Sequence, residues 1–217
     1  MKIHKAPVVQ ALISYYHELL MPKREQTILD HLSLISKALC AGLAKKVHCL
    51  YAQLNNYNPN FIGIPIENLK RREFNLSECK HTIAKEYGFD DWDNVRSLDK
   101  TMYNLAFEHC VTAITTGDLI TLESILTASP SLIHKQSQYG HKASLIHYTA
   151  SNGIELWRQQ VPNNLVSIIR VLIENGADRQ AKMNVYNGQF TAYDLYTSSA
   201  HPKDAGISEI AKELLKP

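Results

Sequence analysis

Apolar residues recur at helical spacing through much of the first hundred residues. From Pro7 to Leu20 they return every three or four positions, which predicts an amphipathic helix that Pro22 ends. A longer stripe follows and predicts one continuous or slightly kinked helix over residues 28–54, with its bend at Gly42. We expect this face to be buried; a coiled-coil dimer seam is the alternative. The stripe consists of Ile28, Leu32, Ile35, Leu39, Leu43, Val47, Leu50 and Leu54.

A loop rich in asparagine, glycine and proline then leads to a second pair of helices. The first begins near Leu76, Gly88 fits its C-terminal cap, and the second covers residues 92–98. Two short helices and a turn over residues 76–98 also suit a helix-turn-helix DNA reader. Carboxylates crowd the second helix and would repel a duplex, so we predict no nucleic-acid binding. These carboxylates are Asp90, Asp91, Asp93 and Asp99, with Arg96 as the basic residue beside them.

The second half of the chain carries a repeated pattern of paired helices. Its clearest unit reads SLIHYTASNG over residues 144–153 and VSIIRVLIENGAD over residues 166–178. Weaker copies flank this unit, one around Gly117 and one from Gly188 to Leu215. These segments resemble ankyrin repeats, whose unit of about 33 residues is two antiparallel helices and a turn.

The ankyrin resemblance implies an all-α fold. It implies an N-terminal helical capping domain over residues 1–100, followed by a short ankyrin-like helical solenoid of about three divergent repeats over residues 101–217. The segment IAKEYGFDDW at residues 83–92 is similar to a stretch that precedes ankyrin repeats in some bacterial proteins. Terminal repeats need a cover against water, so the first hundred residues have a structural role.

The chain departs from the ankyrin pattern in two insertions. Gly153 and Gly176 are 23 positions apart, further than in the family, and residues 201–206 form a second insertion. We expect the insertions to bring four polar side chains together: His147, Asn152, Arg158 and His201. We interpret this cluster as a hydrogen-bond network that pins the long loops; an anion pocket built on Arg158 is the alternative.

Function is predicted by the resemblance, because repeat solenoids bind partners along an extended surface. We expect a protein–protein interaction module whose partner is another, unidentified protein. The alternative is an enzyme or small-anion-binding protein with its pocket in the insertions. The expected partner-binding residues lie at two turn tips: Tyr139, Lys142, Tyr186, Asn187, Gln189 and Phe190.

Composition and motifs exclude several classes of protein and of functional site. The 217 residues carry a net charge of +2 and 45% hydrophobic residues, which fits a globular chain and gives no basic footprint for nucleic acid. Four scattered cysteines without a C-x-x-C pair indicate reduced thiols in the cytoplasm, with export into a host cell left open. No apolar run is long enough for a membrane helix. No nucleophile, metal or cofactor motif is present, so we predict no catalytic residue, metal or cofactor. The oligomeric state stays open.

Overall fold

The computed structural model describes residues 2–207 and 209–217 and divides the chain into two compact units. One unit consists of residues 10–103. The other joins residues 2–9 to residues 104–217, so the first unit is inserted into the sequence of the second. The division near residue 103 lies close to the predicted boundary at residue 100, but the prediction assigned residues 2–9 to the first domain, whereas they belong to the unit of residues 104–217.

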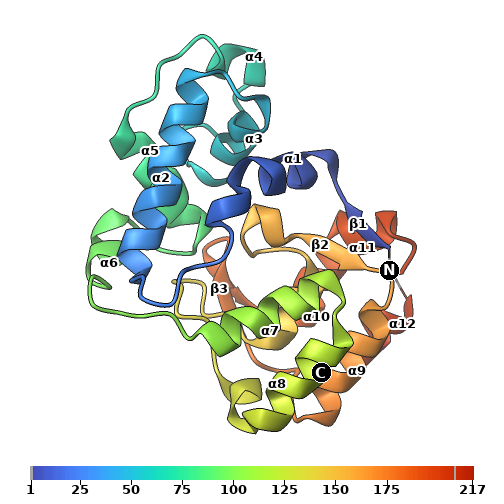
Figure 1. Cartoon of the computed structure of the whole chain (residues 1–217). Coiled ribbons are helices and arrows are strands. Elements are labelled where there is room, and N and C mark those ends of the chain that lie inside the picture. The colour runs from blue at the N-terminus through green and yellow to red at the C-terminus, as the bar shows by residue number, and fades with distance from the viewer. Residues whose placement is uncertain (1, 208) are drawn as a thin grey trace. The chain divides into compact units, whose positions relative to one another are not determined.

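The unit of residues 10–103 is helical throughout its regular elements (Figure 1). Its longest helix, α2, packs against α5 and carries the first five residues of the apolar stripe, Ile28 to Leu43, on its buried face. Thr27 and Asn75 cap the starts of α2 and α5 through their side-chain oxygens. The elements are the end of α1 (Pro7–Tyr16), the 3₁₀ helix η1 (His17–Leu19), α2 (Ile28–Ala44), α3 (His48–Tyr57), α4 (Ile66–Leu69), α5 (Leu76–Glu86) and α6 (Trp92–Arg96).

The expected continuous helix over residues 28–54 is wrong, because the chain breaks between α2 and α3. Lys46 has a φ of 58°, a left-handed conformation that follows the end of α2, and Val47 is the N-cap of α3. Gly42 is not the bend. A Cβ there would lie 2.3 Å from both Leu50 Cδ1 and the Tyr15 hydroxyl oxygen, so Gly42 allows side chains of α3 and α1 to pack closely against α2.

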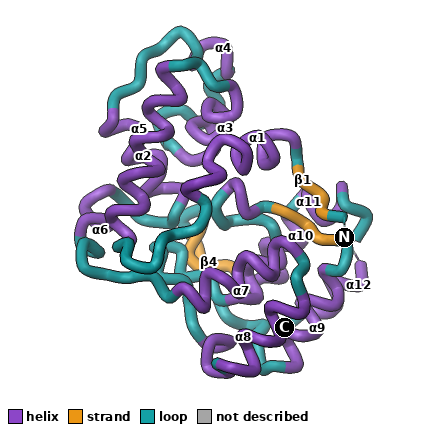
Figure 2. The backbone as a smooth tube through the Cα atoms, viewed as in Figure 1, coloured by secondary structure: helices purple, strands orange, loops and turns teal. Residues whose placement is uncertain are grey.

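The second unit is helical apart from two short ribbons of strands (Figure 2). One ribbon pairs β1 with β2 antiparallel, so that Ile3 lies opposite Pro162; the other is the β3–β4 hairpin. The elements are β1 (Ile3–Lys5), α7 (Leu105–Thr116), α8 (Leu119–Ala128), η2 (Pro130–His134), η3 (Leu145–Ala150), η4 (Leu156–Arg158), β2 (Gln160–Pro162), α9 (Leu165–Glu174), β3 (Met183–Val185), β4 (Gly188–Phe190), α10 (Ala192–Ser198), α11 (Ala200–Asp204) and α12 (Glu209–Leu215). The all-α prediction is therefore confirmed at the level of fold class.

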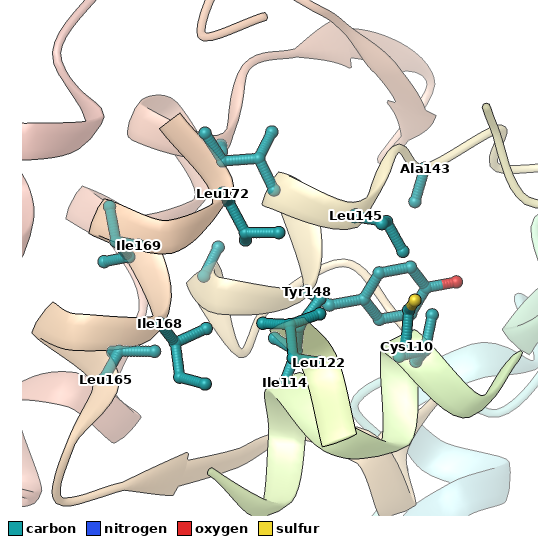
Figure 3. Close-up of a cluster of buried hydrophobic side chains, with 14 of the residues drawn as sticks. Cys110, Ile114, Leu122, Ala143, Leu145, Tyr148, Leu165, Ile168, Ile169 and Leu172 are labelled. Carbon is teal, nitrogen blue, oxygen red and sulfur yellow. The ribbon is translucent and has the colours of Figure 1, made fainter. Parts of the chain in front are cut away.

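Two series of helices enclose the core of this unit. In one series α7 packs on η3 and η3 on α10; in the other α8 packs on α9 and α9 on α12. Figure 3 shows the core between them, with Tyr148 of η3 above Ile114 of α7 and Ile168 of α9. Among the described residues, no helix combines the length and hydrophobicity that crossing a bilayer requires.

Candidate functional site

The β3–β4 hairpin presents the most exposed aromatic side chain of the second unit. Tyr186 and Asn187 form its two-residue turn with φ values of 53° and 59°, the geometry that matches the twist of paired strands. The Tyr186 side chain is 65% exposed, yet its hydroxyl donates a hydrogen bond of 2.7 Å to Asn152 Oδ1. Its ring also meets the edge of Phe190 at 6.5 Å between centroids. The Tyr186 ring at the hairpin tip is therefore exposed to solvent and also held in place by contacts.

The other expected partner-binding residues differ in their accessibility. Lys142 and Gln189 are exposed, and Phe190 is partly buried against the hydrophobic core. Tyr139 is only 1% exposed, so its expected role in touching a partner is wrong. Its ring packs instead against His141, at 5.6 Å between centroids.

A buried ion cluster surrounds Arg158. The guanidinium donates to Glu108 of α7 at 2.5 Å and to Glu155, just before η4, at 3.4 Å. All three side chains are at most 3% exposed. The rings of Trp157, Tyr148 and Tyr139 approach the guanidinium carbon to 4.6, 5.6 and 6.0 Å, within the range of cation–π attraction. The cluster joins the long insertion to α7.

The two carboxylates of this cluster respond differently to their surroundings. Burial raises the pKa of Glu108 above its usual range, and the attraction of Arg158 only partly opposes that shift. Burial acts on Glu155 in the same direction, but Arg158 and His141 outweigh it and lower the pKa. The carboxylates in turn outweigh the burial of Arg158 and raise its pKa well above the usual value. The surroundings of Arg158 and Glu155 therefore favour their charged forms, whereas burial disfavours the charged form of Glu108.

The other three residues of the expected polar cluster have different partners. His147 Nδ1 lies 2.8 Å from the Ser144 hydroxyl oxygen and accepts from the Ser144 backbone N–H, which caps η3. Asn152 donates to the Leu195 carbonyl and to the Ser198 hydroxyl, both at 3.1 Å. His201 lies half-buried in α11, and burial lowers its pKa. The structure thus replaces one expected network of four residues with separate local networks.

The sequence analysis did not predict that Glu108, Glu155 and His141 belong to the cluster around Arg158. His141 Nε2 lies 3.6 Å from Glu155 Oε1, which adds a second basic side chain to the Arg158 cluster. A signal for Glu108 was available, because it shares a helix face with Val111 and Thr115 at spacings of three and seven. A carboxylate on a buried face calls for a cationic partner.

The helical pair over residues 76–98 forms a shallow cleft of about 340 Å³. The Lys80 ammonium lies 5.3 Å from the centre of the Trp92 ring, and Arg96 pairs with Asp93 at 2.9 Å. The second helix, α6, has only five residues.

Across residues 2–207 and 209–217, no group of three or more His, Cys, Asp or Glu side chains is placed to hold a metal ion.

Comparison with known proteins adds no further constraint on this geometry. No protein-family model, curated protein or solved structure matches the chain.

Proposed function

We propose that this chain is a protein-binding module built on ankyrin-like repeats, and that the tip of the β3–β4 hairpin is its principal contact. The two series of packed helices support the solenoid, since an ankyrin array stacks first helices on first helices and second on second. The Ser144–His147 cap agrees with this assignment, because that histidine occupies the same place in the repeat motif.

The observation that carries the proposal is the fixed exposure of Tyr186. A tyrosine offers a large apolar ring with one polar end, and such residues are enriched at protein interfaces. Holding the ring in place before binding removes part of the entropy cost of association. The contacts of Tyr186 with Asn152 and Phe190 provide that order while leaving most of the ring accessible.

The geometry around Arg158 argues against the alternative of an anion pocket. Both terminal nitrogens of the guanidinium already donate to carboxylates inside the protein. An added anion would have to displace Glu108 or Glu155 from a buried pair, which is unfavourable.

The proposal is tested by affinity capture with quantitative mass spectrometry. The full chain is compared with Tyr186→Ser and with Ile120→Ser, a control at a residue of α8 that is 82% exposed. We expect one set of proteins to be retained by the parent and by Ile120→Ser and to be depleted at least tenfold by Tyr186→Ser, the loss expected for about 1.4 kcal/mol of contact energy. Equal retention by all three chains would contradict the proposal.

A further inference from the structure

Two loops of the second unit lie next to each other, and we call them the tip loops. Residues 135–143 lie between η2 and η3, and residues 179–190 lie between α9 and α10 and contain the β3–β4 hairpin. The Asn184 backbone N–H donates to the His141 carbonyl oxygen at 2.8 Å and so joins the two loops. Helix η3, which follows the first loop, also packs against α9 and α10, which bound the second. The tip loops therefore form adjoining parts of one surface.

Positive charge on residues 104–217 is concentrated in the tip loops. The loops contain four basic residues and no aspartate or glutamate, whereas the rest of residues 104–217 contains five basic residues and ten acidic ones. All four basic side chains of the loops are exposed, and no ion pair in the described part of the chain involves any of them. These residues are Lys135, Lys142, Arg179 and Lys182.

The carboxylates that flank the second tip loop are already occupied by local hydrogen bonds. Asp178 Oδ1 accepts from the backbone N–H two residues later at 2.8 Å. Asp194 Oδ2 accepts from the backbone N–H and the hydroxyl of Thr191, at 2.9 and 2.7 Å. Arg179 donates to a neutral group, the Lys216 carbonyl oxygen, at 2.8 Å. The positive charge of the tip loops is therefore left for a partner to balance.

We propose that the tip loops bind an acidic segment of the partner protein beside Tyr186, through Lys142 and Lys182. This inference rests on the proposed function, because it names the chemistry of the partner that Tyr186 contacts. Complementary charge speeds the encounter of two proteins and selects among partners. Carboxylates are repelled by the acidic remainder of residues 104–217 and attracted by the tip loops, so the charge distribution directs an acidic segment to this surface.

The first test selects peptides from a phage library of random twelve-residue sequences, with the full chain as bait. We expect the retained peptides to contain at least twice the proportion of aspartate and glutamate found in the starting library. The most strongly retained peptide is then synthesised, and its dissociation constant is measured by fluorescence polarisation. It should bind at least tenfold more weakly in about 1 M salt than in about 0.1 M salt, because salt screens exposed charges.

Matched pairs of charge reversals locate the binding surface. Lys142→Glu with Lys182→Glu changes the tip loops, and Lys203→Glu with Arg170→Glu makes the same change in net charge at exposed residues of α11 and α9. We expect the first pair to weaken binding of the selected peptide at least tenfold and the second pair to weaken it less than threefold. The composition of the retained peptides is measured on the unmodified chain, so it decides the proposal even where a variant folds poorly.

Several results would overturn this inference. They are retention of neutral or basic peptides, retention of no peptide, equal effects of the two variant pairs, and tighter binding of a single-stranded oligonucleotide than of the acidic peptide through the same lysines.

Tyr186→Ser separates this inference from the proposed function. Retained peptides that are not acidic but are lost with Tyr186→Ser would support the proposed contact and overturn the acidic partner. Acidic peptides that depend on Lys142 and Lys182 but bind Tyr186→Ser as tightly as the parent would support the acidic partner and overturn the hairpin tip as the principal contact.

Discussion

Residues 153–162, the first part of the long insertion after Gly153, and residues 183–190, the hairpin, both connect helices of the second unit but differ in burial. Every residue of this part of the insertion is buried, while most of the hairpin is exposed or partly exposed. The insertion depends on distant partners, Glu108 of α7 and strand β1. The hairpin closes on itself through its own turn. An irregular segment is costly to bury because each of its polar groups needs a partner, and it is inexpensive to expose.

The largest expected effect tests the buried side of this comparison. Arg158→Ala leaves Glu108 and Glu155 without their cation in a dry environment, so we expect a loss of about 3–5 kcal/mol in the free energy of unfolding. Urea denaturation monitored by circular dichroism measures this loss.

A rescue variant separates charge burial from lost packing. Replacing all three residues together, by Arg158→Met, Glu108→Gln and Glu155→Gln, removes every charge of the pair network and should recover most of the stability. If Arg158→Ala unfolds at the same urea concentration as the parent, the stability of the insertion does not depend on its ion cluster. The proposed difference between the insertion and the hairpin would then be wrong.

The second-largest effect is a loss of unfolding free energy at acidic pH that arises from His147. Burial lowers the pKa of His147 to about 4, whereas the unfolded chain binds this proton near pH 6.5. The stability that His147 contributes is therefore complete above pH 6.5 and is lost as pH falls from 6.5 toward 4, by roughly 3 kcal/mol. Unfolding free energies measured across this interval should fall less steeply for His147→Gln than for the parent; parallel curves would contradict the prediction.

The smallest expected change in the free energy of unfolding concerns the exposed hairpin. Tyr186→Asn places a residue that tolerates positive φ at the first turn position while removing the ring and its hydroxyl. These changes oppose each other, so we expect the free energy of unfolding to stay within about 0.5 kcal/mol of the parent by urea denaturation. A loss above about 2 kcal/mol would show that the hairpin tip supports the core as the insertion does.

Helical periodicity predicted most of the helices in the first hundred residues but not where a helix stops. Apolar residues continue in register through the break at residues 45–47, so the pattern over residues 28–54 reads as unbroken. The break itself rests on one left-handed residue, Lys46, whose identity does not indicate that conformation. The starts at Pro7, Ile28 and Leu76 agree with the predicted ones because caps and proline leave local signals.

The candidate site was less predictable because it depends on distant residues. The ankyrin resemblance placed Tyr186 and Asn187 at a turn tip, and the structure has a two-residue turn there. It placed Tyr139 at an exposed tip, although the ring is needed beside Arg158 inside the unit. Glu108 lies 50 positions from Arg158, and no local pattern connects them.

The pairing of β1 with β2 sets an order for biosynthesis. Strand β1 is synthesised before residues 10–103, but its partner at residues 160–162 is made only after that unit has been completed. The intervening unit can collapse on its own contacts while the leading strand waits unpaired. Closing so long a loop is slow compared with local helix formation, so we expect β1 to pair with β2 only after residues 10–103 have folded.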